Sequence, residues 1–106
     1  MIKIVRNHQV TKELAISKID NFINDLISKS FSNDVKIIEP RKQWNGDVML
    51  FSFKVKKGFF SATIEGIVIV NDTDVILTSE LPGMVKALIS EEKIKDTINA
   101  QFNLLF

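Results

Sequence analysis

The side chains best suited to chemistry in this sequence are one histidine and its acidic residues, since the chain has no cysteine. A histidine works as a general base when a carboxylate orients its ring, and the acids that we consider for His8 are Asp47 and Glu65. No spacing in the sequence demands that arrangement. In the simpler interpretation, His8 is a polar residue that closes the first strand and bonds to the backbone. We therefore assign no catalytic residue and keep an enzyme that uses His8 as an alternative.

The other carboxylates are explained better by local structure than by metal binding. Asp72 and Asp74 lie in an Asn-Asp-Thr-Asp segment that is typical of a turn, and they lack the further oxygen ligands of a calcium loop. Glu91 and Glu92 point in different directions on a helix and suit its first turn. The chain has no phosphate-binding loop and no dinucleotide fingerprint. The sequence predicts no metal site and no cofactor.

Basic residues concentrate on two neighbouring strands that we expect in the middle of the chain. They are Lys36, Arg41, Lys42, Lys54, Lys56 and Lys57. A basic patch of Lys36, Lys54 and Lys56 would suit an anionic partner such as a headgroup, a nucleotide or RNA. A solvated strand face that resists edge pairing explains them better. The net charge of +1 also gives no strong nucleic-acid signal, so weak nucleic-acid binding is a third alternative.

Large apolar residues are expected on both faces of the sheet. On the core side we expect a cavity between the sheet and the last helix, with these ligand candidates: His8, Trp44, Phe51, Phe53, Phe60 and Phe102. On the other side, isoleucines occupy positions where a solvated sheet needs polar residues. The predicted interaction surface comprises Phe59, Ile67 and Ile69 on this side, together with Leu105 and Phe106, which the final helix would present to an apolar partner. Trp44 suits either a core anchor or the lip of a pocket.

Hydrophobic periodicity predicts a strand, a helix, four antiparallel strands and a helical C-terminal part. The strands are residues 2–7, a strand that opens at Val35 and Ile37, residues 48–56, residues 60–70 and residues 75–81. The first helix runs from about Thr11 to Ser30, and Ser90 divides the C-terminal part into a short and a longer helix. An antiparallel sheet with one apolar face needs a cover, which the N-terminal and the long C-terminal helix supply. We expect an α+β fold of the order β-α-β-β-β-β-α, a reduced form of the helix-grip arrangement.

Three local signals refine this sheet. Asn45-Gly46 predicts a hairpin with a type I′ turn, which requires positive φ values. Pro40 predicts that the second strand is an edge strand or contains a bulge, because proline cannot donate to a central ladder. Phe60 alternates with Ile64 and Val68, which predicts that its ring lies in the core.

The composition is that of one globular domain over residues 1–106. A hydrophobic fraction of 45% and a charged fraction of 25% exclude a disordered chain. The first residues lack the pattern of a signal peptide, and no apolar stretch approaches the ~20 residues of a membrane span. We therefore expect a cytoplasmic protein.

Several short segments resemble a known family in chain order. They are Arg6-Asn7-His8, Trp44-Asn45-Gly46-Asp47 with Phe51 after it, Ala62-Thr63-Ile64-Glu65-Gly66, Glu80-Leu81-Pro82 and Lys93-Ile94. The chain resembles the polyhydroxyalkanoic acid system proteins, small bacterial proteins named for genes near those of polyester granules. His8, Trp44 and Gly46 match recurrent positions of that family. The resemblance implies a bacterial cytoplasmic protein associated with storage granules or their regulation, and it implies no catalytic residue.

The element order is also similar, more loosely, to START-like lipid-transfer domains, in which a sheet grips a long C-terminal helix. This likeness implies an apolar ligand between sheet and helix, or, for the enzymatic alternative, a START-like cyclase or hydrolase that uses His8. We expect a non-enzymatic binding or interaction protein whose partner is an apolar small molecule or a polyester granule surface. A homodimer is consistent with the two sheet edges and the apolar outer positions.

Overall fold

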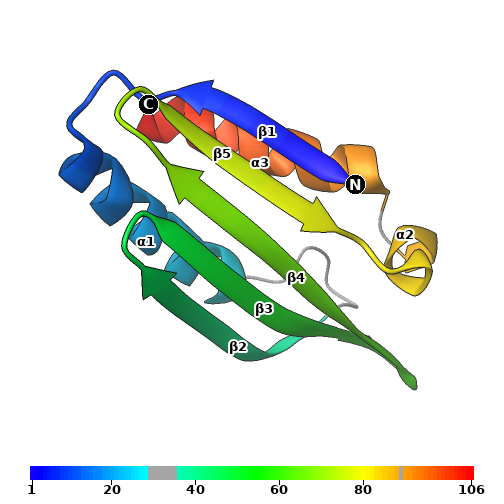
Figure 1. Cartoon of the computed structure of the whole chain (residues 1–106). Coiled ribbons are helices and arrows are strands. Elements are labelled where there is room, and N and C mark those ends of the chain that lie inside the picture. Colours follow the sequence, from blue (N-terminus) through cyan, green and yellow to red (C-terminus); the bar gives the residue numbers. More distant parts are fainter. Residues whose placement is uncertain (29–35, 89) are drawn as a thin grey trace.

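The described residues form strands and helices in the predicted α+β order (Figure 1). The structure is a computed structural model that describes residues 1–28, 36–88 and 90–106. The elements are β1 (Ile2–Asn7), α1 (Lys12–Ser28), β2 (Lys36–Asn45), β3 (Val48–Lys57), β4 (Phe60–Val70), β5 (Asp74–Glu80), α2 (Gly83–Leu88) and α3 (Glu91–Leu105). The order β-α-β-β-β-β-α is confirmed, and the C-terminal part is divided into a short and a longer helix as expected.

The strands described in the structure form one antiparallel sheet in the order β1-β5-β4-β3-β2. Strands β2 to β5 follow one another as a meander, in which each strand pairs with its neighbour in the sequence. Strand β1 joins the far edge, where Ile2 lies opposite Ser79 and Asn7 lies opposite Asp74. The first strand therefore ends beside the turn between β4 and β5.

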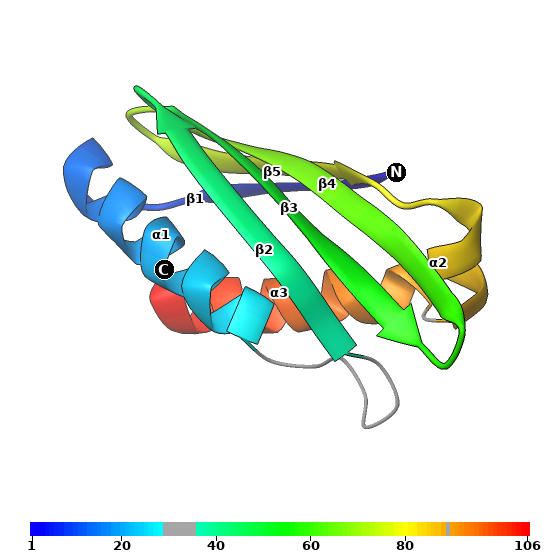
Figure 2. The ribbon, with the colours of Figure 1, turned by 90° about the horizontal axis from the view of Figure 1, so that it is seen from below.

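Helices α1 and α3 cover the same side of the sheet, which we call the inner face (Figure 2). The side of the sheet away from these helices is the outer face. Alternate strand residues point inward and are buried: Ile2, Ile4, Met49, Phe51, Phe53, Val55, Ile64, Val68, Val70, Val75 and Leu77. The helices contribute Ala15, Ile19, Phe22, Ile23, Ile94, Ile98 and Phe102 to the same core. The predicted cover of one apolar face by the two helices is confirmed.

Both long helices begin at the residues that their sequences indicate. The Thr11 hydroxyl accepts from the Leu14 N–H at 3.2 Å, and the Ser90 hydroxyl accepts from the Lys93 N–H at 3.1 Å. Each bond satisfies an amide that has no partner within its own helix. The predicted end of the first helix, Ser30, lies outside the described residues.

The hairpin between β2 and β3 lies where it was predicted, but its turn type differs. Asn45 pairs with Val48, so the two-residue loop is Gly46–Asp47. Gly46 has a φ of 63°, whereas neither Asn45 nor Asp47 has a positive φ. A type I′ turn requires positive φ at both central residues, so the predicted turn type was wrong. The loop lies one residue later in the chain than the Asn45-Gly46 pair on which the prediction was based. The hairpin between β3 and β4 is built alike, with Gly58 at a φ of 59°.

Strand β2 is both an edge strand and irregular, as Pro40 predicted. Its pairing with β3 shifts between Ile38 and Arg41. Glu39 within this interval has a φ of 51°, which lies in the left-handed region. Because β2 has one extra residue between Ile38 and Arg41, the alternation changes there. Odd-numbered residues face the helices before this point, and even-numbered residues face them after it. The predicted start of this strand, Val35, lies outside the described residues.

At Gly66 on β4, a side chain would not fit on the inner face. It lies opposite Phe51, and a Cβ at residue 66 would overlap the Phe51 ring. The ring therefore lies across the glycine and shields its backbone. This contact makes Phe51 part of the packed core.

Candidate functional site

His8 is 1% exposed and makes two hydrogen bonds to the backbone. The Val10 N–H donates to Nδ1 at 3.3 Å, so the ring proton is on Nε2, which donates to the Asn71 carbonyl at 2.8 Å. The ring centroid lies 6.3 Å from that of Phe106, on the helix side of the sheet. Both ring nitrogens are thus engaged in joining the end of β1 to the β4–β5 turn. This is the geometry of a structural histidine.

The two carboxylates considered as partners of His8 lie elsewhere. Asp47 pairs with the Lys12 ammonium at 2.5 Å. Glu65 is exposed on the outer face, across the sheet from His8. Among the described residues, no carboxylate bonds to the His8 ring. The structure therefore does not bring together the acid–base pair that we considered for an enzyme.

The space between the sheet and α3 is small. It has a volume of about 20 Å³, which is room for about one water molecule. Among the six ligand candidates, Phe51 and Phe53 line this space. Phe102 is fully buried and packs edge-on against Phe22, with ring centroids 5.1 Å apart. These phenylalanines form a packed core, and the space that Phe51 and Phe53 line beside α3 is too small for an apolar ligand in this conformation.

Trp44 anchors β2 to α1. Its indole N–H donates to an Asp20 carboxylate oxygen at 2.8 Å, and the Lys42 ammonium lies 2.7 Å from the same oxygen. Lys42 also donates to the Asn24 side chain at 2.7 Å. The hydrogen bonds from Lys42 and then Trp44 lower the pKa of Asp20 below its usual value. Of the two roles considered for Trp44, anchor and pocket lip, the structure supports the anchor.

Two members of the predicted interaction surface pack against the core instead. Leu105 and Phe106 are half-buried at the end of α3, and Phe106 lies 6.0 Å from the Phe102 ring. The neighbouring Leu104 is 81% exposed. A helix turn brings adjacent residues to different sides, so the run of apolar residues does not form one exposed patch.

The hairpin tip, residues 57–60, carries two exposed phenylalanines. Phe59 lies in the two-residue loop and is fully exposed, and Phe60 is 56% exposed. The predicted burial of Phe60 was wrong, because β5 pairs with β4 only from Glu65 onward, so Phe60 lies beyond the end of β5, next to the loop that joins β3 to β4. The projecting hairpin is visible in Figure 1.

Lysines lie on the outer face next to the hairpin tip. Lys36 pairs with Lys56 across β2 and β3, and Lys54 lies one position further along the same face. Lys54 bonds to the Glu39 carboxylate at 3.0 Å, so part of this charge is neutralised. Lys42 instead turns to α1, as described above. The basic patch predicted from Lys36, Lys54 and Lys56 is therefore assembled, without Lys42.

The outer face carries an apolar band on the half of the sheet away from the tip. Its first row runs across four strands as Val48, Ile69, Ile76 and Val5, and its second row pairs Leu50 with Ile67. Val5, Leu50, Ile67 and Ile69 are exposed. Two of these residues, Ile67 and Ile69, were predicted as an interaction surface, and the register adds the other four.

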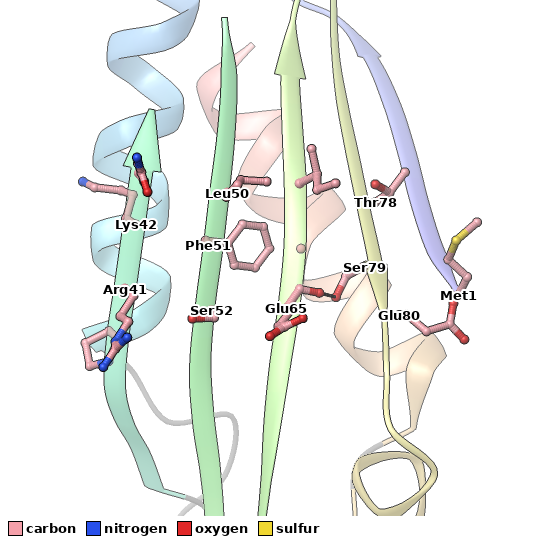
Figure 3. Close-up of a pocket in the computed structure, with 14 residues that line it drawn as sticks. Met1, Arg41, Lys42, Leu50, Phe51, Ser52, Glu65, Thr78, Ser79 and Glu80 are labelled. Atoms are coloured by element: carbon pink, nitrogen blue, oxygen red, sulfur yellow. Dashed lines mark hydrogen bonds between the residues drawn. The ribbon is translucent and has the colours of Figure 1, made fainter. Parts of the chain in front are cut away.

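A charged row lies between the band and the lysines. Arg41, Ser52, Glu65 and Glu80 are opposite one another on β2, β3, β4 and β5 (Figure 3). This row and the Leu50–Ile67 row line a groove of about 960 Å³ across the outer face. The Ser79 hydroxyl donates to the Glu65 carbonyl at 2.8 Å beneath it. The groove thus has a charged end and an apolar end.

Sequence reasoning missed Val5, Leu50, Arg41 and Glu80 as parts of this surface. Leu50 could have been found from the sequence, because alternation places it on the same face of β3 as Ser52 and Lys54, which is the solvent-exposed face. Val5 and Glu80 could not be found in this way, since their neighbours come from the order of strands in the sheet. Alternation along one strand assigns a face but not a neighbour across the sheet.

Comparisons with known proteins agree with the resemblance noted in the sequence. The family model of polyhydroxyalkanoic acid system proteins matches residues 2–106. No curated protein and no solved structure matches the chain. Among the described helices, none is long and apolar enough to cross a membrane. The chain belongs to the family of polyhydroxyalkanoic acid system proteins.

Proposed function

We propose that this chain is a non-enzymatic interaction protein that attaches to polyhydroxyalkanoate granules in the cytoplasm through its hairpin tip. The observation that carries the proposal is the exposure of two adjacent aromatic rings, Phe59 and Phe60, at the end of a projecting hairpin. Large apolar side chains exposed together are a recurrent feature of docking sites. Membership of the family points to the polyester granule as the surface.

The free energy of attachment comes mainly from the two rings. A large apolar side chain that leaves water gains about 1.5–3 kcal/mol on full burial. Because the tip has no β5 neighbour, both rings can enter a soft apolar surface while the packed core stays unchanged. Two rings therefore support a reversible attachment.

The lysines beside the tip add a charge-dependent contribution. Lys36, Lys56 and Lys57 lie next to the rings and would meet anionic groups at the granule surface. Attraction between exposed charges weakens as salt increases, whereas burial of the rings does not. We expect attachment to weaken moderately, and not to disappear, at high salt.

The other functions considered have less support. An apolar ligand between the sheet and α3 would have to separate these layers, since the space there is about 20 Å³. The backbone engages both ring nitrogens of His8, which leaves no free position for a general base. Nucleic-acid binding is still to be tested, because the lysine patch could contact phosphates and Phe59 could stack on a base.

Co-sedimentation with washed polyhydroxyalkanoate granules tests the proposal. We expect the Phe59→Ser, Phe60→Ser double variant to bind at least about tenfold more weakly than the native chain, because each ring supplies about 1.5 kcal/mol or more. Leu104→Ser is the matched control, since it removes an apolar side chain that is 81% exposed in α3, far from the tip. It should bind as the native chain does.

Three results would overturn the proposal: no binding of the native chain to granules, equal binding of the tip variant, or an equal loss in the Leu104→Ser control. Binding to single-stranded RNA that decreases steeply with salt would favour the nucleic-acid alternative instead.

A further inference from the structure

Three cross-strand rows on the outer face have a self-complementary order. The first is the charged row, Arg41, Ser52, Glu65 and Glu80 on β2 to β5. The second is Gln43, Leu50, Ile67 and Thr78, and the third is Asn45, Val48, Ile69 and Ile76. In the first row the base lies on β2 and the two acids lie on β4 and β5, and in the other two rows β3 and β4 both carry apolar residues.

We infer that the outer face binds a second copy of this chain, related by a two-fold axis that runs parallel to the strands between β3 and β4. This inference is independent of granule attachment. The axis places β2 over the partner's β5 and β3 over the partner's β4. Arg41 then faces Glu80 of the partner subunit, and Ser52 faces Glu65 of the partner subunit. In the apolar rows, Leu50 faces the partner's Ile67.

Other two-fold arrangements of the same face bring unlike rows together. An in-plane axis perpendicular to the strands and centred on the second row places Glu65 over the partner's Ile69, which buries a carboxylate against an apolar side chain. An axis along β4 places Glu65 over the partner's Glu65, which is repulsive. Of these three arrangements, the axis between β3 and β4 is the one that brings Arg41 to an acid and places both apolar residues of β3, Val48 and Leu50, over isoleucines.

Charges that are unbalanced within one copy support this partner. Glu65 and Glu80 are directly opposite on β4 and β5, an arrangement that is unfavourable for like charges. Arg41 lies three strands from Glu80, about 14 Å away at ordinary strand spacing, which is too far for a salt bridge. None of these three side chains forms an ion pair with a residue that the structure describes. A second copy would bring Arg41 to the acidic pair.

The size of the face sets the expected affinity. Four strands and about six residues along each give a flat area of about 19 by 20 Å. This is below the ~800 Å² that each partner buries in an interface of standard size. We therefore expect a dimer with a dissociation constant in the micromolar range, about 1–100 µM.

The arrangement also orients the hairpin tips. An axis parallel to the strands leaves the strand direction unchanged, so both copies present Phe59 at the same end of the dimer. Two tips on one side would bind a surface together, and linked sites bind more tightly than either site alone. Attachment of the native dimer would then exceed that of a monomeric variant with intact tips.

Sedimentation equilibrium of the native chain from about 1 to 500 µM tests the inference. We expect a monomer–dimer equilibrium, and Ile67→Lys should weaken it at least about tenfold because it places an ammonium in the apolar rows. Arg41→Glu and Glu80→Arg should each weaken association about tenfold, and the double variant should return to within about threefold of the native value. The rescue distinguishes a contact between copies, since these residues are too far apart within one.

Leu104→Lys is the control, because this exposed residue lies in the helix layer and should leave the dimer unchanged. Circular dichroism spectra and melting temperatures establish that each variant is folded. A native chain that remains monomeric throughout the concentration range overturns the inference. A dimer that Ile67→Lys leaves intact, or charge variants without rescue, also overturns it. These measurements use no granules, so their outcome is independent of granule attachment.

Discussion

The two faces of the same strands have opposite environments in this molecule. On β4, the inner residues Ile64, Val68 and Val70 are buried, whereas Ile67 and Ile69 on the outer face are exposed. The space between the sheet and α3 is about 20 Å³, and the outer groove is about 960 Å³. The helices account for the inner apolar residues and leave the outer ones without a partner in the described chain.

This difference separates scaffold from interaction surface. The inner face holds the aromatic residues that looked like ligand contacts, Phe51, Phe53 and Phe102, and all are tightly packed. The outer face and the hairpin tip hold apolar residues that stability of one chain does not require. The binding that we propose uses the hairpin tip and the outside of the sheet, and the packed inner face maintains their shape.

The largest expected effect tests the packed side. Phe102→Ala should lower the free energy of unfolding by about 3–5 kcal/mol, because the ring is fully buried between the sheet and α1 and the deletion leaves a cavity. Urea denaturation monitored by circular dichroism measures it. Leu104→Ala in the same helix, 81% exposed, should change the same quantity by less than about 0.5 kcal/mol. A Phe102→Ala effect below about 1 kcal/mol would show that α3 does not cover the core.

Much of this contrast could be predicted from the sequence. The alternation in β3 and β4 identified the inner residues, and the three-and-four spacing of Ile19, Phe22 and Ile23 identified the covering helix. Caps at Thr11 and Ser90 were also identifiable, since each depends on contacts within a few residues.

The remaining features depend on distant segments. The burial of Phe60 was predicted from alternation, yet burial also requires a strand or helix nearby, and β5 ends before it reaches this residue. The row of Arg41, Glu65 and Glu80 exists because of strand order, which local patterns do not determine. The hydrogen bond that His8 makes through Nε2 is to the Asn71 carbonyl, 63 residues further along the chain, so the partner could not be identified from neighbouring residues.

An intermediate effect compares the faces with one chemical change. Val75→Thr should cost about 1–3 kcal/mol of unfolding free energy, because it places a hydroxyl in the fully buried inner layer. Val5→Thr on the neighbouring strand keeps the same shape but is 57% exposed, so it should change stability by less than about 0.5 kcal/mol. Urea titrations at micromolar concentration measure both. Equal costs at the two sites would contradict the assignment of an open outer face.

The smallest effect concerns the ion pair that fastens α1 to the edge of the sheet. Hydrogen bonds from Lys42 and Trp44 lower the pKa of Asp20 in the folded chain. A carboxylate with a lowered pKa stabilises the fold at pH values above its unfolded pKa of about 3.9, and this contribution is lost as the pH falls through the folded value. The carboxylate is 36% exposed, so solvent screening keeps the contribution small, below about 1 kcal/mol.

Asp20→Asn tests this reasoning, because the amide keeps the shape and an acceptor but loses the charge. The native chain should be the more stable of the two at pH 7, and the difference should shrink as the pH falls below about 4. Urea midpoints from pH 2 to pH 7 measure it. Asp96→Asn, at an exposed position of α3 without a salt bridge to a described residue, is the control and should change the free energy of unfolding at pH 7 by less than about 0.5 kcal/mol. A gap that is constant with pH would mean that the charge at Asp20 contributes nothing to the free energy of unfolding.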